Sequence, residues 1–288
     1  MIVGTVKEIW RYPVKSMAGG QLDECNVGER GIPGDRGWAL RDDEAREIRG
    51  AKKFPVLMQC SARYLQEPSG AATPPAEITL PDGTRVRSDD PQASARLSEL
   101  IGKRVTLWPL RPAEDDEHYR RTVSLDEPEM RAIMGRLPDE PLPDISAFPQ
   151  DVLQEILAFT SPRGTYFDAF PLHLLTTAWL DDLARTNSKA RFDRRRFRPN
   201  FLITPEPGRT GKTELDWCGR ELRVGEMTTK IEMPVVRCSM TAQPQADLPK
   251  DPSVLRTIVR DSDQNVGVYA SVAAAGRVRV GDPVELLK

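Results

Sequence analysis

The sequence predicts a mainly β fold with some α (α+β), divided into two β-rich domains. Two observations lead to this prediction. Short alternating segments rich in Val, Ile, Trp and Tyr recur along the chain, and clusters of Gly, Pro and Asp separate them. The length of 288 residues suits one large or two ordinary domains, because a domain usually holds roughly 100–200 residues. Many short strands with such turns between them favour a β-barrel or a sandwich.

The first β-rich domain is predicted over residues 1–110. Its strands are predicted at residues 2–12, 21–28, 36–42, 56–66 and 105–108. A hairpin is predicted at residues 78–86, because an Asp-Gly pair lies between two apolar segments. Asp90 is expected to cap a short helix that begins with Pro91.

Residues 111–171 differ in composition from the rest of the chain. They hold eight prolines and thirteen acidic residues, which is typical of irregular connecting segments. One helix is expected, over residues 151–159. A loop of this length is uncommon unless it has a function, such as that of a lid. We therefore assign residues 111–167 as a connecting segment with a short helix.

The second β-rich domain is predicted over residues 168–288. Leu175, Trp179 and Leu183 recur every fourth residue and indicate a helix that runs to about Arg185. Asp251 is expected to open another helix. Strands are predicted at residues 199–204, 221–224, 227–236, 266–271, 277–280 and 283–287.

Composition excludes several classes of function. The 41 Lys and Arg residues nearly balance the 43 Asp and Glu residues, which argues against a whole-chain electrostatic binder of nucleic acid or of membranes. No stretch approaches the roughly 20 apolar residues of a membrane span, and the N-terminus lacks the features of a signal peptide. The expectation is therefore a soluble, cytoplasmic protein.

Histidine and cysteine usage narrows the chemistry further. Two histidines, His118 and His173, leave little for a histidine metal centre or a Ser-His-Asp triad. The four cysteines form no C-x-x-C pair, which removes the usual zinc-finger, thioredoxin and iron–sulfur patterns. Cys25, Cys60 and Cys218 have no partner nearby in the sequence, so we expect structural roles for them.

The segment around Cys238 offers a nucleophile or a metal ligand. A predicted strand ends at residues 233–236 and passes directly to Arg237 and Cys238. A neighbouring guanidinium favours the thiolate, which is the form that attacks electrophiles and binds soft metals. Spacing alone favours a simpler interpretation, in which the cysteine is buried and packs as a small apolar group.

The densest basic cluster lies at residues 191–200. Four of the five residues from 194 to 198 are arginine. Most such runs are a solvated surface, but Phe197 separates these arginines so that they cannot all face one way. Arg198, with the rigid proline after it and the amide of Asn200, is suited to grip a phosphate or another oxyanion.

Two turns near the N-terminus could hold anions. In the first turn, Lys15 and Ser16 lie between a strand end and two glycines, and such donors in a tight loop can bind an anion. In the second turn, Arg36 stands at the start of a predicted strand, two residues after Gly34. Neither is a phosphate-binding P-loop, because the glycine spacing is wrong. A structural turn is the simpler explanation of each.

Thr176 lies near the start of the helix that is predicted to end at about Arg185. A hydroxyl at such a position caps the helix or binds an anion, and spacing alone favours the cap. His173 precedes the same helix, and without a paired ligand we expect it to be structural.

Together these motifs resemble the MOSC family, named for the C-terminal domain of molybdenum cofactor sulfurase. The residues that carry the resemblance are 12–16, 31, 35–38, 52–55, 171–176, 196–200, 234–238 and 280–284. The resemblance implies a MOSC N-terminal β-barrel-like domain over residues 1–110 and a MOSC β-barrel domain over residues 168–288.

The resemblance also implies a molybdenum cofactor, in which molybdenum is held by molybdopterin. In members similar to the mitochondrial amidoxime-reducing component a cysteine thiolate binds the molybdenum, and Cys238 stands at that position as metal ligand and catalytic residue. The positions that match cofactor-holding residues are Lys15, Ser16, Arg36, Lys52, Thr176, Arg198, Asn200 and Arg237. Neither pyridoxal phosphate nor an iron–sulfur cluster is expected in this chain.

The implied function is an oxidoreductase that reduces N-hydroxylated or N-oxygenated small molecules. With no cysteine cluster and no G-x-G-x-x-G motif after a strand, electrons are expected from a separate ferredoxin- or cytochrome-like protein. The alternative is a non-catalytic carrier of cofactor or sulfur, in which Cys238 holds its cargo in transit. Val236 stands where some amidoxime reducers have serine, which leaves the substrate contacts open.

Overall fold

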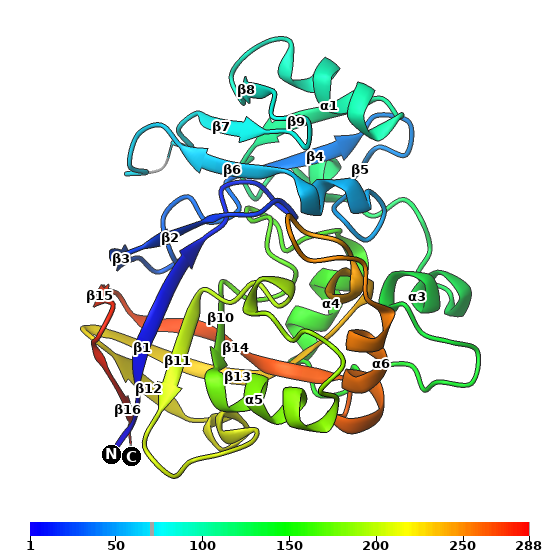
Figure 1. The fold of residues 1–288 in the computed structure, drawn as a ribbon. Helices are drawn as coiled ribbons and strands as arrows, with labels where there is room; N and C mark the ends of the chain where they lie inside the picture. The colour runs from blue at the N-terminus through cyan, green and yellow to red at the C-terminus, as the bar shows by residue number, and fades with distance from the viewer. Residues whose placement is uncertain (70–71, 288) are drawn as a thin grey trace.

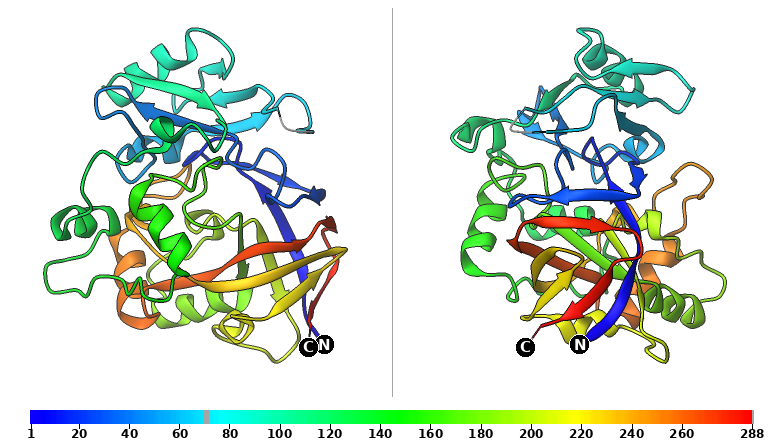
Figure 2. Two further views of the ribbon diagram at one scale, coloured as in Figure 1. Left: turned by 180° about the vertical axis from the view of Figure 1, so that it is seen from behind. Right: turned by 90° about the vertical axis from the view of Figure 1, so that its left-hand side faces the viewer.

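A computed structural model of the chain describes residues 1–69 and 72–287 (Figure 1). The chain forms a mixed α/β structure around a closed barrel of seven strands. A smaller β-rich unit lies beyond one end of the barrel, at the top of Figure 1 and of both views in Figure 2. The predicted α+β, mainly β fold is confirmed.

The barrel closes because its first strand pairs with strands far along the chain. Its strands are β1 (Ile2–Arg11), β10 (Leu172–Thr176), β11 (Phe201–Pro205), β12 (Glu221–Val224), β13 (Met227–Val236), β14 (Asn265–Ala274) and β16 (Pro283–Leu286). They follow the order β11-β10-β14-β13-β12-β16-β1, and β1 completes the ring by pairing with β11. Only β10 and β11 among these described strands are parallel neighbours.

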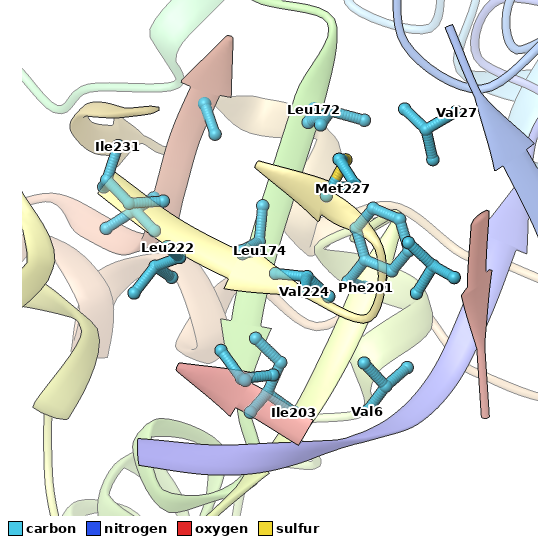
Figure 3. Packing of buried hydrophobic residues seen from close by; sticks show 14 of the residues in the cluster. Val6, Val27, Leu172, Leu174, Phe201, Ile203, Leu222, Val224, Met227 and Ile231 are labelled. Carbon is cyan, nitrogen blue, oxygen red and sulfur yellow. The ribbon is translucent and has the colours of Figure 1, made fainter. Parts of the chain in front are cut away.

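Apolar side chains from the barrel strands fill its interior. Figure 3 shows Val6, Leu174, Phe201, Val224 and Ile231 directed toward one another from five different strands. Each of these side chains is at most 1 % exposed. Alternating side chains of a closed sheet point inward, so the same pattern that predicted the strands also forms the core.

The first strands of the chain pair with strands of the barrel rather than with the smaller unit. β1 belongs to the barrel, β2 (Gly20–Leu22) pairs with β1, and β3 (Glu24–Val27) pairs with β15 (Gly276–Arg279). The chain therefore begins in the barrel and joins the smaller unit only near Val14, which bridges to Trp38. Alternation within one strand does not reveal the partner strand, so the sequence alone did not predict these pairings.

The smaller unit contains two three-stranded sheets and a helix. One sheet is formed by β5 (Glu47–Ile48), β4 (Trp38–Asp42) and β9 (Val105–Pro109), and the other by β6 (Ser61–Tyr64), β7 (Ala76–Thr79) and β8 (Arg85–Arg87). Helix α1 (Ala93–Ile101) packs on β9. The unit has its own buried core, which includes Leu40 and Leu97. β7 and β8 confirm the predicted hairpin.

Two predictions for this unit are wrong in part. The strand predicted at residues 56–66 begins as a 3₁₀ helix, η1 (Pro55–Gln59), because Pro55 opens the turn and the next apolar residues are buried together. The helix predicted to follow Asp90 begins at Ala93. Asp90 instead accepts a hydrogen bond from the Gln92 backbone N–H at 2.8 Å, in the turn before the helix.

Strand β10 is an element that the sequence analysis missed. Leu175 lies in β10, whereas the helix α5 (Thr177–Thr186) begins after it, so the helix predicted from Leu175 is two residues too long at its start. All five residues of β10 are buried. A strand covered on both faces shows no alternation, and its apolar run continues the helical spacing of the segment that follows.

The connecting segment is more regular than its composition predicts. It contains α2 (Asp116–Tyr119), α3 (Glu127–Met134) and α4 (Gln150–Ala158), and only α4 was predicted. The signal for α3 was present, since Asp126 caps its first turn by accepting from the Glu129 N–H at 2.9 Å. α3 and α4 lie on the side where the smaller unit meets the barrel (Figure 1).

Two further helices cover the outside of the barrel. α5 and α6 (Pro252–Asp261) pack together through a buried cluster that includes Trp179 and Ile258. Asp251 caps α6 as predicted, accepting from the Ser253 N–H at 3.0 Å. Three 3₁₀ turns, η2 (Arg194–Arg196), η3 (Thr213–Trp217) and η4 (Ser239–Ala242), link the barrel strands. None of the described helices combines the length and the apolar character needed to cross a bilayer.

Candidate functional site

Eight of the nine predicted site residues line one cavity between the smaller unit and the barrel. These eight are Lys15, Ser16, Arg36, Lys52, Arg198, Asn200, Arg237 and Cys238. The first four come from N-terminal loops and the last four from loops and strand ends of the barrel. The described lining contains six cationic side chains and one carboxylate, so we expect an anionic ligand.

Three residues of this cavity have a strained backbone. Seven described non-glycine residues have a left-handed backbone, and three of them are Ser16 with φ of 70°, Arg36 with φ of 51° and Arg198 with φ of 56°. Such a conformation costs on the order of 1–3 kcal/mol at each residue and persists where the surrounding structure enforces it. The strain therefore supports a functional role for these three positions.

Tyr12 holds two of the guanidinium groups in place. The guanidinium of Arg198 lies 4.2 Å from the centre of the Tyr12 ring, and that of Arg36 lies 4.9 Å from it. The Tyr12 hydroxyl donates to the carbonyl oxygen of Pro199 at 2.9 Å. The Asp35 carboxylate, which pairs with Arg36, also accepts from the Tyr12 backbone N–H at 2.8 Å. The aromatic ring thus lets two like charges lie close together.

Arg198 has a hydrogen-bond donor that the fold does not use. Its Nη1 donates to the carbonyl oxygen of Met17, whereas its Nη2 is buried and has no partner among the described residues. Burial, and next the charge of Arg36, lower the pKa of Arg198 to about 10. An anion in the cavity would supply the missing acceptor and favour the charged form of Arg198.

Arg237, in contrast, uses all three of its guanidinium nitrogens within the fold. Its Nε donates to the carbonyl oxygen of Val266 at 2.9 Å, its Nη1 to that of Phe197 at 3.2 Å, and its Nη2 to His173 Nε2 at 2.7 Å. Because a guanidinium only donates, His173 Nε2 accepts and the ring is neutral. Burial and the charge of Arg237 hold the pKa of His173 well below its usual range. Arg237 therefore positions the strand end before Cys238.

Asn200 also uses both of its amide hydrogens within the fold. Its Nδ2 donates to the carbonyl oxygen of Trp10 at 3.2 Å and to Asp35 at 2.9 Å, and its Oδ1 accepts from the His173 backbone N–H at 3.2 Å. Asn200 lines the cavity, but the donation to an oxyanion that the sequence suggested is not available without breaking these bonds. Its hydrogen bonds connect the barrel to the turn that carries Arg36.

Thr176 is not a lining residue of this cavity, and the cofactor contact implied for it stays a prediction. It is fully buried, because β10 is covered on both faces. Its Oγ1 accepts from the Trp179 backbone N–H at 3.2 Å and donates to Glu214 at 2.6 Å. The helix cap that spacing alone favours is the observed role.

Glu214 makes the stability of the fold sensitive to pH. Burial raises its pKa to about 7, compared with 4.5 for an ordinary glutamate. Its contribution to stability is therefore fully present below about pH 4.5 and is lost as the pH rises through about 7. Between pH 5 and pH 8, the free energy of unfolding of wild type should fall by up to about 3 kcal/mol more than that of Glu214→Gln. The melting temperature of wild type should therefore fall more steeply over this range than that of the variant.

Exposed Glu221 provides the control, and Glu221→Gln should follow wild type. Parallel curves for wild type and Glu214→Gln would contradict the assignment.

Asp168 is the carboxylate of the cavity, and the sequence analysis did not single it out. Lys15 Nζ donates to Asp168 at 2.9 Å and to the carbonyl oxygens of Tyr166 at 2.7 Å and Phe167 at 3.3 Å, which uses its three hydrogens. Burial would raise the pKa of Asp168, but the Lys15 and Lys52 ammonium groups hold it well below its usual range. Its only sequence signal is that it is a single acidic residue among aromatic ones.

The ammonium group of Lys52 lines the cavity and has no partner among the described residues. It makes no hydrogen bond or ion pair with another residue in the described part of the chain, although the charge of Asp168 raises its pKa above the usual range. The loop that carries it is held by Ser16, whose Oγ accepts from the Ala51 N–H at 2.9 Å. A Cβ at position 50 would lie 2.3 Å from that Oγ, so Gly50 is required for this approach.

Cys238 differs from the other three cysteines in its surroundings. It follows β13 at the start of η4, and its partly exposed side chain lines the cavity. Cys25 and Cys60 are buried in separate cores, where burial raises the pKa of their thiols to about 12 and about 11. Cys218 packs against the barrel core. The interpretation of Cys238 as a buried packing residue therefore does not hold.

The arginine run at residues 191–200 does not act as one site. Arg195 pairs with Asp193 at 2.7 Å and with Asp247 at 2.5 Å, and Arg194 pairs with Glu8. Buried Arg196 donates only to backbone carbonyl oxygens. Within the run, only Arg198 carries the orphaned donor described above.

These residues fit the molybdenum cofactor that the resemblance implies. The cofactor is an anionic dithiolene with a phosphate, which needs oxyanion donors, and molybdenum accepts a soft thiolate ligand. The cavity offers an unpartnered guanidinium nitrogen on Arg198, an unpaired ammonium on Lys52 and the Cys238 thiol on one wall. Arg237 and Lys15 add positive charge but donate within the fold, and Arg36 donates there through its Nη1.

Known proteins of similar sequence or structure give independent information about the family of this chain. The family model described as MOSC domain matches residues 162–285, and the one described as MOSC N-terminal beta barrel domain matches residues 3–97. The chain is 25 % identical to mitochondrial amidoxime-reducing component 1 of Mus musculus, covering 99 % of this chain and 83 % of that protein. It is 26 % identical to mitochondrial amidoxime reducing component 2 of Bos taurus, covering 98 % and 83 %. Among solved structures, the YUAD protein from Bacillus subtilis aligns with a TM-score of 0.47 and 14 % identity, over 99 % of this chain and 96 % of that one.

Proposed function

Because the chain belongs to the MOSC family, we propose that it binds a molybdenum cofactor in the Cys238 cavity and reduces N-hydroxylated or N-oxygenated small molecules. The observation that carries the proposal is the cavity itself, where one thiol faces a cation-rich wall with an unused donor on Arg198. The relatives named amidoxime-reducing components support the class of reaction.

Each residue of the cavity has a distinct task in this proposal. Cys238 is the protein ligand of the metal, and the bound cofactor supplies two-electron chemistry at molybdenum. Arg198 and Lys52 donate to its anionic groups, since their donors are free. Arg237, held by His173, keeps the strand end rigid so that the thiol is aimed into the cavity. Asp168 remains ionised beside Lys15 and can only accept hydrogen bonds.

We further propose that electrons come from a separate ferredoxin- or cytochrome-like protein. The four cysteines of this sequence lie singly, and two of them are buried in different cores. A cluster of iron and sulfur needs several thiolates close together. The cytoplasmic location and the absence of nucleic-acid or membrane partners stay predictions.

An assay with different electron donors tests this proposal. Molybdenum-loaded protein with NADH alone is expected to show no turnover of an N-hydroxylated substrate, because residues 1–288 contain no nicotinamide fingerprint. Turnover should appear with a reduced viologen dye, or with a reductase and a small iron–sulfur or haem carrier. Protein without molybdenum, assayed with the same dye, controls for direct chemical reduction.

The outcomes of this assay separate the candidate functions. Sustained turnover with NADH and purified protein alone would contradict the need for a donor. No turnover with any donor, at full molybdenum occupancy, would favour the non-catalytic carrier of cofactor or sulfur.

A further inference from the structure

A second, largely apolar cavity adjoins the Cys238 cavity. The two cavities share the lining residues Lys15, Ser16, Lys52, Met134, Asp168 and Met240. We call this second cavity the apolar chamber. Its volume is about 200 Å³. The function proposed above uses the polar residues of the shared neck but does not explain the apolar chamber behind it.

Helix faces that the protein does not cover form one wall of the apolar chamber, and its lining also includes the charged residues Glu47, Arg49, Lys53, Arg121 and Glu129. α3 and α4 carry apolar side chains toward it, including Ile133 from α3 and Leu153 and Ile156 from α4, yet neither helix has a buried residue. Leu157 also lines the chamber and is 44 % exposed. Apolar faces left open in a concave site usually mark a place where a ligand binds.

The apolar chamber is held at a fixed place next to the thiol. Buried Arg136, just after α3, donates to the carbonyl oxygen of Arg237 at 2.9 Å and to Gln264 at 2.8 Å. Ser239, next to Cys238, donates from its Oγ to the carbonyl oxygen of Ile133 at 2.9 Å. The end of α3 is thus tied to the two residues on either side of Cys238, so a molecule in the chamber lies beside the reacting site.

We propose that the apolar chamber binds the apolar body of the substrate while its N–O head extends past Lys15, Lys52 and Asp168 to the Cys238 cavity. This inference rests on the proposed function and narrows its substrate class. An apolar protein cavity of about 150 Å³ accommodates benzene. A chamber of about 200 Å³ therefore accepts one substituted aromatic ring, or an alkyl chain of roughly six carbons.

A series of hydroxamic acids with one head and a growing chain tests the inference. Acetohydroxamic, butyrohydroxamic, hexanohydroxamic and octanohydroxamic acid are titrated into the molybdenum-loaded protein by calorimetry, and KM is measured with reduced viologen as donor. The dissociation constant is expected to fall by roughly fourfold for each added methylene. The gain should stop near the hexano compound, because the chamber is then full.

A substitution in the apolar chamber shows whether the gain arises there. Ile156→Asn places a polar group on the wall and is expected to reduce the gain per methylene to less than roughly twofold. Ile156 is partly exposed, so folding should survive, and Leu157→Asn serves as a second variant at an exposed position. Val280, which is 43 % exposed and is not a lining residue of the chamber, gives the control variant Val280→Asn, with the wild-type slope expected.

The two readouts separate failure of the chamber from failure of the proposed function. Two results would overturn the role of the chamber even if every hydroxamate is reduced. One is an affinity that does not depend on chain length, and the other is an unchanged gain in affinity per methylene in Ile156→Asn and Leu157→Asn. If these variants abolish the gain in affinity per methylene but no hydroxamic acid is reduced, the chamber is supported as a binding site and the proposed reductase function is refuted.

Discussion

Protein carrying Cys238→Ser is expected to retain little molybdenum when it is made in cells that synthesise molybdopterin, whereas wild type should carry about one metal per chain. A serine hydroxyl is a hard ligand that stays protonated at neutral pH, so it replaces a thiolate poorly. The fold should persist, because Cys238 is partly exposed at a strand end and contributes little to the core. Elemental analysis of both proteins measures the difference.

The control for this substitution is Cys218→Ser. Cys218 is also partly exposed but packs against the barrel core and is not a lining residue of the cavity. It should leave the molybdenum content at the wild-type level. Equal molybdenum in wild type and Cys238→Ser would remove the ligand assignment, and with it the strongest part of the proposed site.

Loss of the Arg198 side chain is expected to have the next largest effect. Arg198→Ala removes the unused Nη2 donor and the Nη1 bond that ties the barrel to the carbonyl oxygen of Met17. One charge-assisted hydrogen bond contributes about 1.5–3 kcal/mol, so cofactor affinity should fall by roughly ten- to a hundredfold. Cofactor that binds only the native state should raise the melting temperature of wild type, and by less in the variant.

Arg195→Ala serves as the matched control, because Arg195 pairs with Asp193 and Asp247 and is not among the lining residues of the cavity. It should keep wild-type cofactor content after gel filtration. Two results count against the role of Arg198: equal cofactor retention in Arg198→Ala and wild type, or a wild-type melting temperature that cofactor does not change.

The short motifs anticipated much of the candidate site. Lys15, Arg36 and Arg198 were selected as oxyanion donors from loops with glycine or proline beside them, and the structure places all three on one cavity. Local sequence was sufficient here because the tight turns that carry these side chains are a local property. The tasks of the donors could not be predicted in the same way. Whether a guanidinium is used or free depends on carbonyl groups far along the chain.

Asp168 and Thr176 both show that the role of a side chain depends on residues far from it in the sequence. Asp168 gains its place only because Lys15 and Lys52 arrive from distant loops, and nothing around it in the sequence indicates them. Thr176 matches a family motif, yet a strand covered on both faces buries it beside Glu214. Resemblance identifies a position in the chain, whereas the neighbours of its side chain decide what it contacts.

The sequence by itself determined the mainly β class and several strands of the barrel, with residues 221–224 and 227–236 predicted at their observed bounds. It did so because alternation along a strand reports which side chains are buried. Only the tertiary structure decided that β1 closes the barrel, that α3 and α4 leave an open chamber, and that Arg198 keeps a free donor. Each of these depends on the partner of a group, and hydrogen bonds and packing join residues that are far apart in the chain, where local periodicity carries no information.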